Sequence, residues 1–198
     1  MIRVGRVDFV NSDPIYYGLE NGLVETDVEI KLVKSFPTAL NSMLAQGDID
    51  IAPLSTIEYA RNPKSYSVLP NLAISSEGEV ILLFSKFDIG ELGDKKVAVP
   101  STSSTSVALL KILMAKKYDI LPEYVTMDPD FDEMLEVADA ALMVGDHALI
   151  AERDNDNPSI DVYDLGREWH KFTGDRMVYA IWGVTRKASM DEGNSTRA

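Results

Sequence analysis

The sequence predicts an α/β protein of two lobes, with mostly parallel sheets joined by two hinge strands. Strand and helix patterns alternate from the N-terminus, which is typical of parallel strands connected by crossover helices. Two apolar segments, Val80–Ser85 and Met177–Thr185, bracket a second run of strand and helix patterns. We expect these two segments to cross between the lobes as a hinge. Lobe 1 is then expected to contain residues 1–86 with 178–198, and lobe 2 residues 87–177.

Lobe 1 begins with three predicted strands, each of which leads into a helix. From β-branched content and alternation, the expected strands are Ile2–Phe9, Val28–Val33 and Ile49–Leu54. Ser12 or Asp13 is expected to cap the first helix, because Pro14 suits its first turn, and this helix should end near Gly22. This alternation is the basis for predicting a parallel sheet.

The next two helices of lobe 1 have recognisable end signals. A helix over Pro37–Gln46 should end at Gly47, since glycine adopts the left-handed conformation that closes many helices. The third helix follows Ser55-Thr56-Ile57-Glu58. This tetrad fits a capping box, in which the side chains of Ser55 and Glu58 each accept a hydrogen bond from the other's backbone N–H.

Lobe 2 is predicted to continue the same alternation. The expected strands run from Lys95 through Val99, over Ala140–Val144 and over Val162–Leu165. The expected helices cover the apolar residues Val107–Met114, then Asp130–Val137 and Ala148–Ala151. Lobe 2 is therefore predicted to be a self-contained α/β segment.

Composition narrows the possible functions. A formal charge of −13 and the lack of a basic patch argue against nucleic acid, and no apolar run approaches the roughly 20 residues that span a bilayer. Zero cysteines exclude disulfides, thiol catalysis and cysteine-ligated metals. Because the chain starts directly as a strand and shows no signal-peptide core, we expect a cytoplasmic protein, either a monomer or a homodimer.

The segment Ser101–Ser106 is the most informative part of the chain. Its hydroxyl residues follow a short β-branched strand and open directly into a helix. Unpaired N–H groups at a helix start attract anions, and short hydroxyl side chains add further donors. One Ser or Thr would be enough to cap the helix, so the number of hydroxyls favours a pocket for a carboxylate or a phosphate.

Similar polar clusters follow other predicted strands, at the edge where open α/β sheets bind ligands. The full set is Asn11-Ser12, Ser55-Thr56, Ser75-Ser76, Ser101–Ser106 and Gly145-Asp146. A cap or a turn explains any one of them, and for Asp146 the cap is favoured, but their recurrence in both lobes indicates a site. His147 is next to the last cluster, and an acid/base role for it stays open beside a structural one. The two histidines lack a second ligand at metal-like spacing, so no metal site is expected.

A set of motifs lies in a fixed order along residues 2–186. They are Val7-Asp8-Phe9-Val10-Asn11-Ser12-Asp13-Pro14, Gln46-Gly47-Asp48-Ile49-Asp50-Ile51-Ala52, Ile74-Ser75-Ser76-Glu77-Gly78, Ser103–Leu110, Leu142–Leu149, Asp164–Trp169 and Phe172-Thr173-Gly174. Together they resemble the menaquinone-biosynthesis enzymes of the futalosine route. The resemblance is closer to chorismate dehydratase, whose first motif reads Asn-Ser-x-Pro, than to the sister dihydroxynaphthoate synthase, which carries a cysteine-containing motif there.

This resemblance implies a fold similar to type II periplasmic binding proteins and a lyase that dehydrates chorismate to 3-[(1-carboxyvinyl)oxy]benzoate. The family acts on this small dicarboxylate without a metal or an organic cofactor. Asn11 matches the family's loop asparagine and is expected to be catalytic, orienting the departing hydroxyl or the reacting ring. The expected substrate-binding residues are Ser12, Ser55, Ser76, Ser103, Thr105, Ser106, Gly145 and Asp146. The catalytic base stays open, with the substrate's own carboxylate as one candidate.

The chain departs from the family pattern at three places. Members usually continue well beyond the last hinge strand, so lobe 1 is expected to lack its C-terminal completion. An Arg/Asn-Ser pair is missing from the segment that begins at Gly78, and Asp175-Arg176-Met177 replaces a Leu-Pro-Phe of the family. Two alternatives therefore stay open: a non-catalytic binding protein for a small aromatic or cyclic carboxylate, and the related 1,4-dihydroxy-6-naphthoate synthase.

Overall fold

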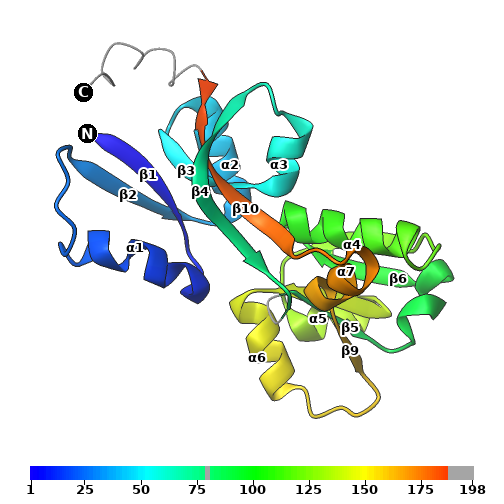
Figure 1. Ribbon diagram of the computed structural model, residues 1–198. Helices are drawn as coiled ribbons and strands as arrows, with labels where there is room; N and C mark the ends of the chain where they lie inside the picture. Colours follow the sequence, from blue (N-terminus) through cyan, green and yellow to red (C-terminus); the bar gives the residue numbers. More distant parts are fainter. Residues whose placement is uncertain (79–80, 187–198) are drawn as a thin grey trace. The chain divides into compact units, whose positions relative to one another are not determined.

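The computed structural model describes residues 1–78 and 81–186 and divides into two units (Figure 1). Unit 1 comprises Met1–Ile74 and the chain from Val178 onward, and unit 2 comprises Ser75–Met177. The chain forms two five-stranded sheets, so the predicted α/β class with two sheets is confirmed. None of the described helices is long and apolar enough to cross a membrane.

The sheet of unit 1 has the strand order β2-β1-β3-β10-β4. Its strands are β1 (Ile2–Val7), β2 (Ile30–Ser35), β3 (Ile51–Ser55), β4 (Tyr66–Ser76) and β10 (Met177–Thr185). β1 pairs in parallel with β2 and β3, whereas β10 runs antiparallel to β3. The helical segments of this unit are the 3-10 turn η1 (Val10–Ser12), α1 (Asp13–Glu20), α2 (Pro37–Gln46) and α3 (Thr56–Arg61).

An apolar cluster of unit 1 brings α2 together with the strands. Leu40 and Leu44 of α2 are fully buried and belong to one cluster with Leu54 of β3. Gly5 in β1 makes room for this packing, because a Cβ at its position would lie only 2.9 Å from the Cβ of Ala52. Close packing, rather than an unusual backbone conformation, therefore requires a glycine in the middle of β1.

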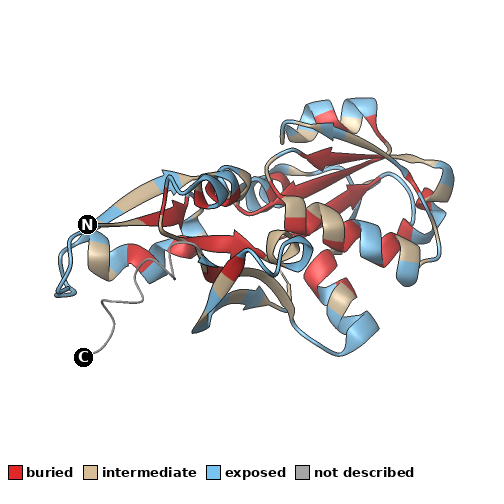
Figure 2. Cartoon of the chain, turned by 90° about the horizontal axis from the view of Figure 1, so that it is seen from above, coloured by how far each residue is buried: buried red, intermediate tan, exposed pale blue. Residues whose placement is uncertain are grey.

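The sheet of unit 2 has the strand order β7-β6-β8-β5-β9. Its strands are β5 (Ile81–Ser85), β6 (Lys96–Pro100), β7 (Glu123–Met127), β8 (Ala140–Val144) and β9 (Asp161–Asp164). β6 is parallel to β7 and β8, and β5 is antiparallel to β8 and β9. The helical segments are η2 (Ile89–Asp94), α4 (Ser104–Lys116), α5 (Phe131–Val137), α6 (Asp146–Asp154) and α7 (Leu165–Thr173). β5 and β8 are buried along their whole length, and Figure 2 shows buried residues concentrated on the strands.

The first connection between the units differs from the predicted hinge strand. The described part of that strand, Ile81–Ser85, pairs with β8 and β9 inside unit 2, so the prediction that it crosses between lobes is wrong. The chain instead leaves unit 1 along β4, and the units divide between Ile74 and Ser75 rather than between residues 86 and 87. β4 escapes sequence patterns because it is an edge strand that contains Pro70 and is half exposed on both faces.

Two predicted helix caps also differ from the structure. Ser12 and Ser55 occupy N-cap positions, but neither side chain caps its helix. The hydroxyl of Ser55 is held by Asn41 of α2, and Glu58 accepts hydrogen bonds from side chains, so the predicted capping box is wrong. The helix end at Gly47 is confirmed, with a left-handed φ of 81°. Contacts with a distant helix thus override a local capping signal.

Candidate functional site

One edge of the unit 2 sheet collects the ends of several segments. β6 and β8 are parallel neighbours, so Pro100 and Val144 end at the same edge. β5 starts there, because Ile81 pairs with Val144 in the antiparallel direction, and β9 ends there at Asp164. Helices α4, α6 and α7 begin soon after β6, β8 and β9, so three helix N-termini share this edge. Open α/β sheets bind ligands at such edges, and free N–H groups there attract anions.

The hydroxyl residues at the start of α4 are buried. Ser103, Thr105 and Ser106 are 8%, 5% and 2% exposed. The Oγ atoms of Ser103 and Ser106 lie 2.8 Å apart and share a hydrogen bond, and the Ser103 side chain does not cap α4. One O–H of the pair donates within it, so the other can donate to an acceptor outside it. Ser101 differs, because its hydroxyl donates to Oδ1 of Asp128 at 3.1 Å.

Gly145 forms the turn from β8 into α6. Its φ of 62° and ψ of −133° lie in a region that residues with a Cβ rarely adopt. Gly145 occupies the N-cap position, so the prediction that Asp146 caps this helix is wrong. Asp146 instead lies in the first helical turn, where the helix dipole stabilises a carboxylate. The backbone therefore requires a glycine here, which allows α6 to begin directly at the sheet edge.

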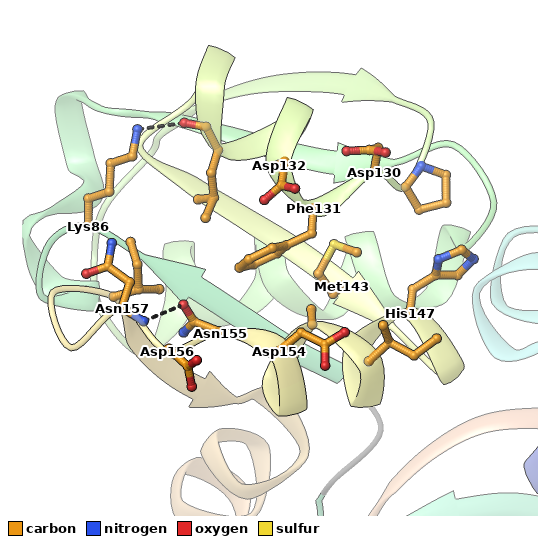
Figure 3. A pocket seen from close by; sticks show the side chains of 15 residues that line it. Lys86, Asp130, Phe131, Asp132, Met143, His147, Asp154, Asn155, Asp156 and Asn157 are labelled. Atoms are coloured by element: carbon orange, nitrogen blue, oxygen red, sulfur yellow. Dashed lines mark hydrogen bonds between the residues drawn. The ribbon is translucent and has the colours of Figure 1, made fainter.

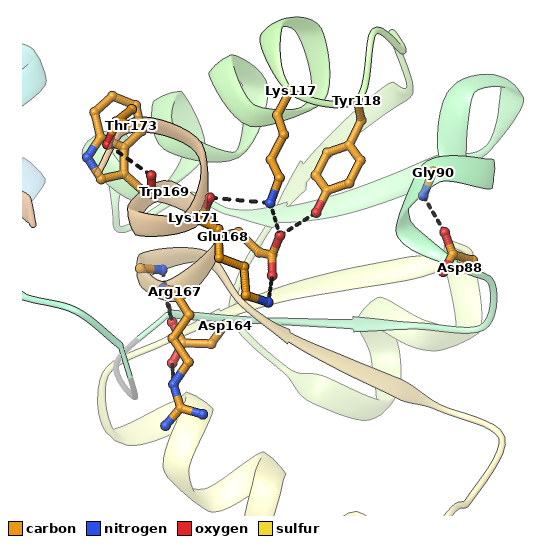
Figure 4. Close-up of polar contacts among 11 residues, drawn as sticks. Asp88, Gly90, Lys117, Tyr118, Asp164, Arg167, Glu168, Trp169, Lys171 and Thr173 are labelled. Carbon is orange, nitrogen blue, oxygen red and sulfur yellow. Dashed lines mark hydrogen bonds and ion pairs between the residues drawn. The ribbon is translucent and has the colours of Figure 1, made fainter. Parts of the chain in front are cut away.

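Ser76 belongs to a turn that packs against the start of α7. Its Oγ lies 3.0 Å from the carbonyl oxygen of Gly78 and 3.2 Å from the Gly78 nitrogen. Gly78 packs so closely that a Cβ on it would lie 2.5 Å from Oδ2 of Asp164. Asp164 in turn caps α7, by accepting hydrogen bonds from the backbone N–H groups of Gly166 and Arg167 (Figure 4). The hydroxyl of Ser76 therefore shapes this turn.

A buried ion cluster joins α7 to the C-terminal end of α4 (Figure 4). Glu168 is 7% exposed and accepts hydrogen bonds from the ammonium groups of Lys117 and Lys171 and from the hydroxyl of Tyr118. Burial alone would raise the pKa of Glu168, but these hydrogen bonds outweigh it and lower the pKa to about 2. Since α4 and α7 both begin at the sheet edge, the cluster fixes how the two helices lie beside each other.

The corresponding edge of unit 1 carries the other predicted residues. β1 and β3 are parallel neighbours, so η1 and Ser55 are found where these strands end. Ser12 is 1% exposed, and its hydroxyl lies 2.6 and 2.7 Å from two backbone carbonyl oxygens. The backbone of Asn11 belongs to η1, but its side chain lies outside the described part of the structure. Ser12 therefore shapes the turn that carries the predicted catalytic residue.

Asn41 is a polar residue of this edge that sequence reasoning missed. It is 9% exposed on α2, and its Oδ1 accepts a hydrogen bond from the backbone N–H of Ser55 at 3.1 Å. Its Nδ2 also donates to the hydroxyl of Ser55 at 2.6 Å. The available signal was an amide between Leu40 and Leu44, on the face of the helix that is otherwise apolar.

Replacing Asn41 by alanine is expected to lower the free energy of unfolding by about 1–3 kcal/mol, because the buried N–H of Ser55 loses its acceptor. The measurement is urea unfolding followed by circular dichroism. Asn62→Ala is the matched control, since Asn62 is exposed and donates its hydrogen bond to Glu58 at the surface. Equal losses in the two variants would contradict this role of Asn41.

A hollow of about 680 Å³ lies in unit 2, and α5 and α6 contribute to its wall (Figure 3). Its apolar lining includes Phe131 and Met143, and four aspartates and His147 also line it. Among the described residues around it, none is a predicted substrate-binding residue. His147 therefore faces this hollow, in a different setting from the buried hydroxyls of α4.

Within each unit the structure brings predicted residues together. In unit 2 one sheet edge holds Ser76, Ser103, Thr105, Ser106, Gly145 and Asp146. In unit 1 the other edge holds the Asn11 turn with Ser12 and Ser55. Across residues 1–78 and 81–186, no group of three or more acidic or histidine side chains is arranged to hold a metal ion. At the unit 2 edge, the Ser103–Ser106 hydroxyl pair at the start of α4 retains an O–H that can donate to a ligand.

Known proteins resemble this chain in sequence. The family model described as menaquinone biosynthesis matches residues 2–197. A chorismate dehydratase of Thermus thermophilus is 28% identical over 172 residues, covering 79% of this chain and 62% of that enzyme. The chain therefore spans less than two thirds of the length of this relative. The 1,4-dihydroxy-6-naphtoate synthase of the same organism is 24% identical over 197 residues, covering 97% of this chain and 68% of that enzyme.

A solved structure supports the fold. The periplasmic aliphatic sulphonate binding protein SsuA of Escherichia coli matches with a TM-score of 0.63 and 19% identity, over 97% of this chain and 67% of that chain. This likeness confirms the predicted periplasmic-binding-protein-like fold. The family model covers almost every residue, and it confirms the resemblance drawn from the ordered motifs. The chain belongs to the menaquinone biosynthesis family.

Proposed function

We propose that the protein is a lyase that dehydrates chorismate to 3-[(1-carboxyvinyl)oxy]benzoate in the futalosine route of menaquinone biosynthesis. The observation that carries the proposal is the group of buried hydroxyls at the start of α4, at the edge of the unit 2 sheet where α6 also begins. Chorismate has two carboxylates, and such an edge suits a carboxylate. Family membership and the likeness to a chorismate dehydratase support the choice of substrate.

The reaction needs positioning more than strong acid or base chemistry. The C–H bond beside the hydroxyl-bearing carbon breaks, its electron pair completes the aromatic ring, and the hydroxyl leaves with a proton as water. Aromatisation drives the reaction, so the protein's task is to hold both carboxylates, exclude bulk water and orient the leaving hydroxyl. In this proposal Asn11 orients that hydroxyl or the ring, and the substrate's own carboxylate is a candidate for the base.

The net negative charge of the protein opposes the binding of an anionic substrate. The formal charge of −13 repels a dianion at long range, so short-range N–H and O–H groups must supply the attraction. The Ser103–Ser106 pair presents an O–H group beside the N–H groups of the first turn of α4. The remaining proposed binding positions are Ser12, Ser55, Ser76, Thr105, Gly145 and Asp146.

Replacing Ser106 by alanine is expected to lower kcat/KM for chorismate about ten- to a hundredfold, because a hydrogen bond to a charged group contributes about 1.5–3 kcal/mol. Mass spectrometry of the reaction would follow an aromatic product that is lighter than chorismate by one water. Ser101→Ala is the matched control and should keep the wild-type kcat/KM, since Ser101 donates to Asp128 instead.

Two results would contradict this proposal in different ways. If Ser106→Ala retains the kcat/KM of Ser101→Ala, the start of α4 does not bind the substrate. If the purified wild-type protein releases no product lighter by one water, the dehydratase activity itself fails.

A non-catalytic binding protein for a small carboxylate is the second candidate. The observation in its favour is the fold, because the E. coli neighbour is by its name a binding protein for aliphatic sulphonates, which are also anions. This candidate predicts that chorismate raises the melting temperature without being converted. Absence of any shift, together with absence of turnover, would remove the binding site as well.

The related dihydroxynaphthoate synthase is the other enzymatic alternative. Its representative from T. thermophilus matches at a lower identity than the dehydratase, 24% against 28%. The motif Asn11-Ser12-Asp13-Pro14 favours the dehydratase, because the synthase carries a cysteine-containing motif at this place and this chain has no cysteine. If the protein converted a futalosine-derived cyclic substrate and left chorismate unchanged, the synthase would replace the dehydratase as the favoured function.

A further inference from the structure

Arg6 is a buried cation whose role the proposed reaction does not use. It lies in β1, next to the last residue of the strand, and is 5% exposed. Its guanidinium meets carboxylates of Asp8, Asp13 and Glu20. A buried charge needs partners, but a single carboxylate would be enough to balance it. The presence of three partners therefore indicates that Arg6 has a role beyond the balance of its own charge.

Two of these partners flank the turn that carries Asn11. Asp8 immediately follows β1, and Asp13 is the first residue of α1, so η1 lies between them. Nη1 of Arg6 is 3.5 Å from Oδ1 of Asp8, and Nη2 donates to Oδ1 of Asp13. One planar guanidinium therefore contacts carboxylates at both ends of the turn. Because the guanidinium is rigid, it fixes the directions of both contacts in addition to supplying a positive charge.

The inside of the turn is fixed independently by Ser12. Its backbone N–H donates to the carbonyl oxygen of Phe9 at 3.0 Å, and its hydroxyl lies 2.7 Å from the same oxygen. Arg6 and Ser12 together leave the backbone of η1 little freedom. Glu20 differs from the two flanking carboxylates, because it lies at the far end of α1 and also pairs with Lys34 at 3.1 Å.

Stability alone explains this arrangement poorly. Buried ion pairs add little net stability, because desolvation of the charges offsets their attraction, and an apolar residue often serves a strand interior as well. Val4, Gly5 and Val7 around Arg6 are all buried, so β1 is otherwise an apolar strand. Specific placement of the turn is what an arginine contributes here and an apolar residue would not.

We propose that Arg6 is a positioning residue, which sets the Asn11 turn by clamping Asp8 and Asp13 on either side of it. This inference rests on the proposed function for its catalytic meaning. The clamp itself consists of contacts within unit 1. A shift of a reacting group by about 1 Å can lower a rate a hundredfold, so a loosened turn should reduce kcat.

The test compares the double variant Asp8→Asn/Asp13→Asn with Glu20→Gln. Both remove carboxylates from Arg6, but only the first removes those that flank the turn. The side chains of Asp8 and Asp13 are more than half exposed, so their neutral variants should fold. The double variant should lose about ten- to a hundredfold in kcat with little change in KM, whereas Glu20→Gln should keep the wild-type kcat.

Amide hydrogen exchange provides a readout that does not depend on activity. The Ser12 amide should exchange faster in the double variant than in the wild type or in Glu20→Gln, because its hydrogen bond to Phe9 is no longer held in place. Wild-type kcat in the double variant, or equal kcat losses in both variants, would overturn the positioning role. If the wild type does not convert chorismate, the proposed function fails, and unchanged exchange in the double variant would then overturn the clamp separately.

Discussion

Replacing Glu168 by glutamine is expected to lower the free energy of unfolding of unit 2 by about 3 kcal/mol near neutral pH. The substitution keeps the size of the side chain but removes the charge that Lys117 and Lys171 contact. Lys117 is 19% exposed, so it would be left with little water and no counter-ion from this position. Urea unfolding followed by circular dichroism measures the change.

The same carboxylate should make the stability of the wild type depend on pH. Its pKa falls from an ordinary value of 4.5 to about 2 in the folded chain, which corresponds to about 3 kcal/mol. Because the folded state binds the proton less readily than the unfolded state, this contribution is complete above pH 4.5 and disappears as the pH falls toward 2. Glu168→Gln should therefore lose less stability than the wild type over this pH window.

The matched control is Asp154→Asn. Asp154 accepts two hydrogen bonds from Arg153, at 2.6 and 2.9 Å, so its geometry resembles that of a strong ion pair. Both side chains are more than half exposed, however, and water screens such pairs. The control should leave the unfolding midpoint unchanged, and an equal effect in the two variants would show that burial does not set the strength of the Glu168 cluster.

Replacing Phe84 by alanine should produce the largest loss of stability, about 3–5 kcal/mol. Phe84 is completely buried in β5, and its ring packs edge-on against Phe131 of α5 with centroids 4.8 Å apart. The substitution leaves a cavity under α5 that the central strands cannot close by small shifts, because protein interiors are densely packed. Urea unfolding of the purified variant measures the loss.

Phe87→Ala is the control for this substitution. Phe87 lies three residues further along the chain and is 36% exposed, and its ring meets the ammonium of Lys95 at 4.9 Å. An exposed contact of this kind contributes about 0.5–1 kcal/mol. If Phe84→Ala cost no more than Phe87→Ala, the core around β5 would have to collapse into the space, contrary to the packing described here.

The charge distribution of the chain bears on the proposed substrate. A protein with a formal charge of −13 must bind an anion through donors within hydrogen-bonding distance. The edge of the unit 2 sheet supplies these at the N-terminus of α4 with its buried hydroxyls, and the Glu168 cluster keeps α4 and α7 together. Loss of the cluster should therefore weaken the proposed carboxylate site as well as the fold.

Local sequence patterns were enough for many elements. Ala140–Val144 and Met177–Thr185 agree with the structure at both ends, because a short apolar run between turn residues is a sufficient signal for a strand. The helix over Pro37–Gln46 agrees too, because a proline at its start and a glycine after its end set its limits. β4 was missed because it lies at a sheet edge and has no regular apolar pattern, although its backbone is hydrogen-bonded to β10.

For the candidate site as well, local sequence predicted some features and only the folded chain decided the others. The types of residue that follow each strand can be read from neighbouring positions, and they pointed to hydroxyl-rich helix starts and to the family. The bonds these residues make cannot be read in that way, because the partners are distant in sequence: Asn41 holds Ser55, and Lys117 holds Glu168. Propensity acts over a few residues, whereas burial and ion pairing depend on which segments packing brings together, and only the folded chain decides that.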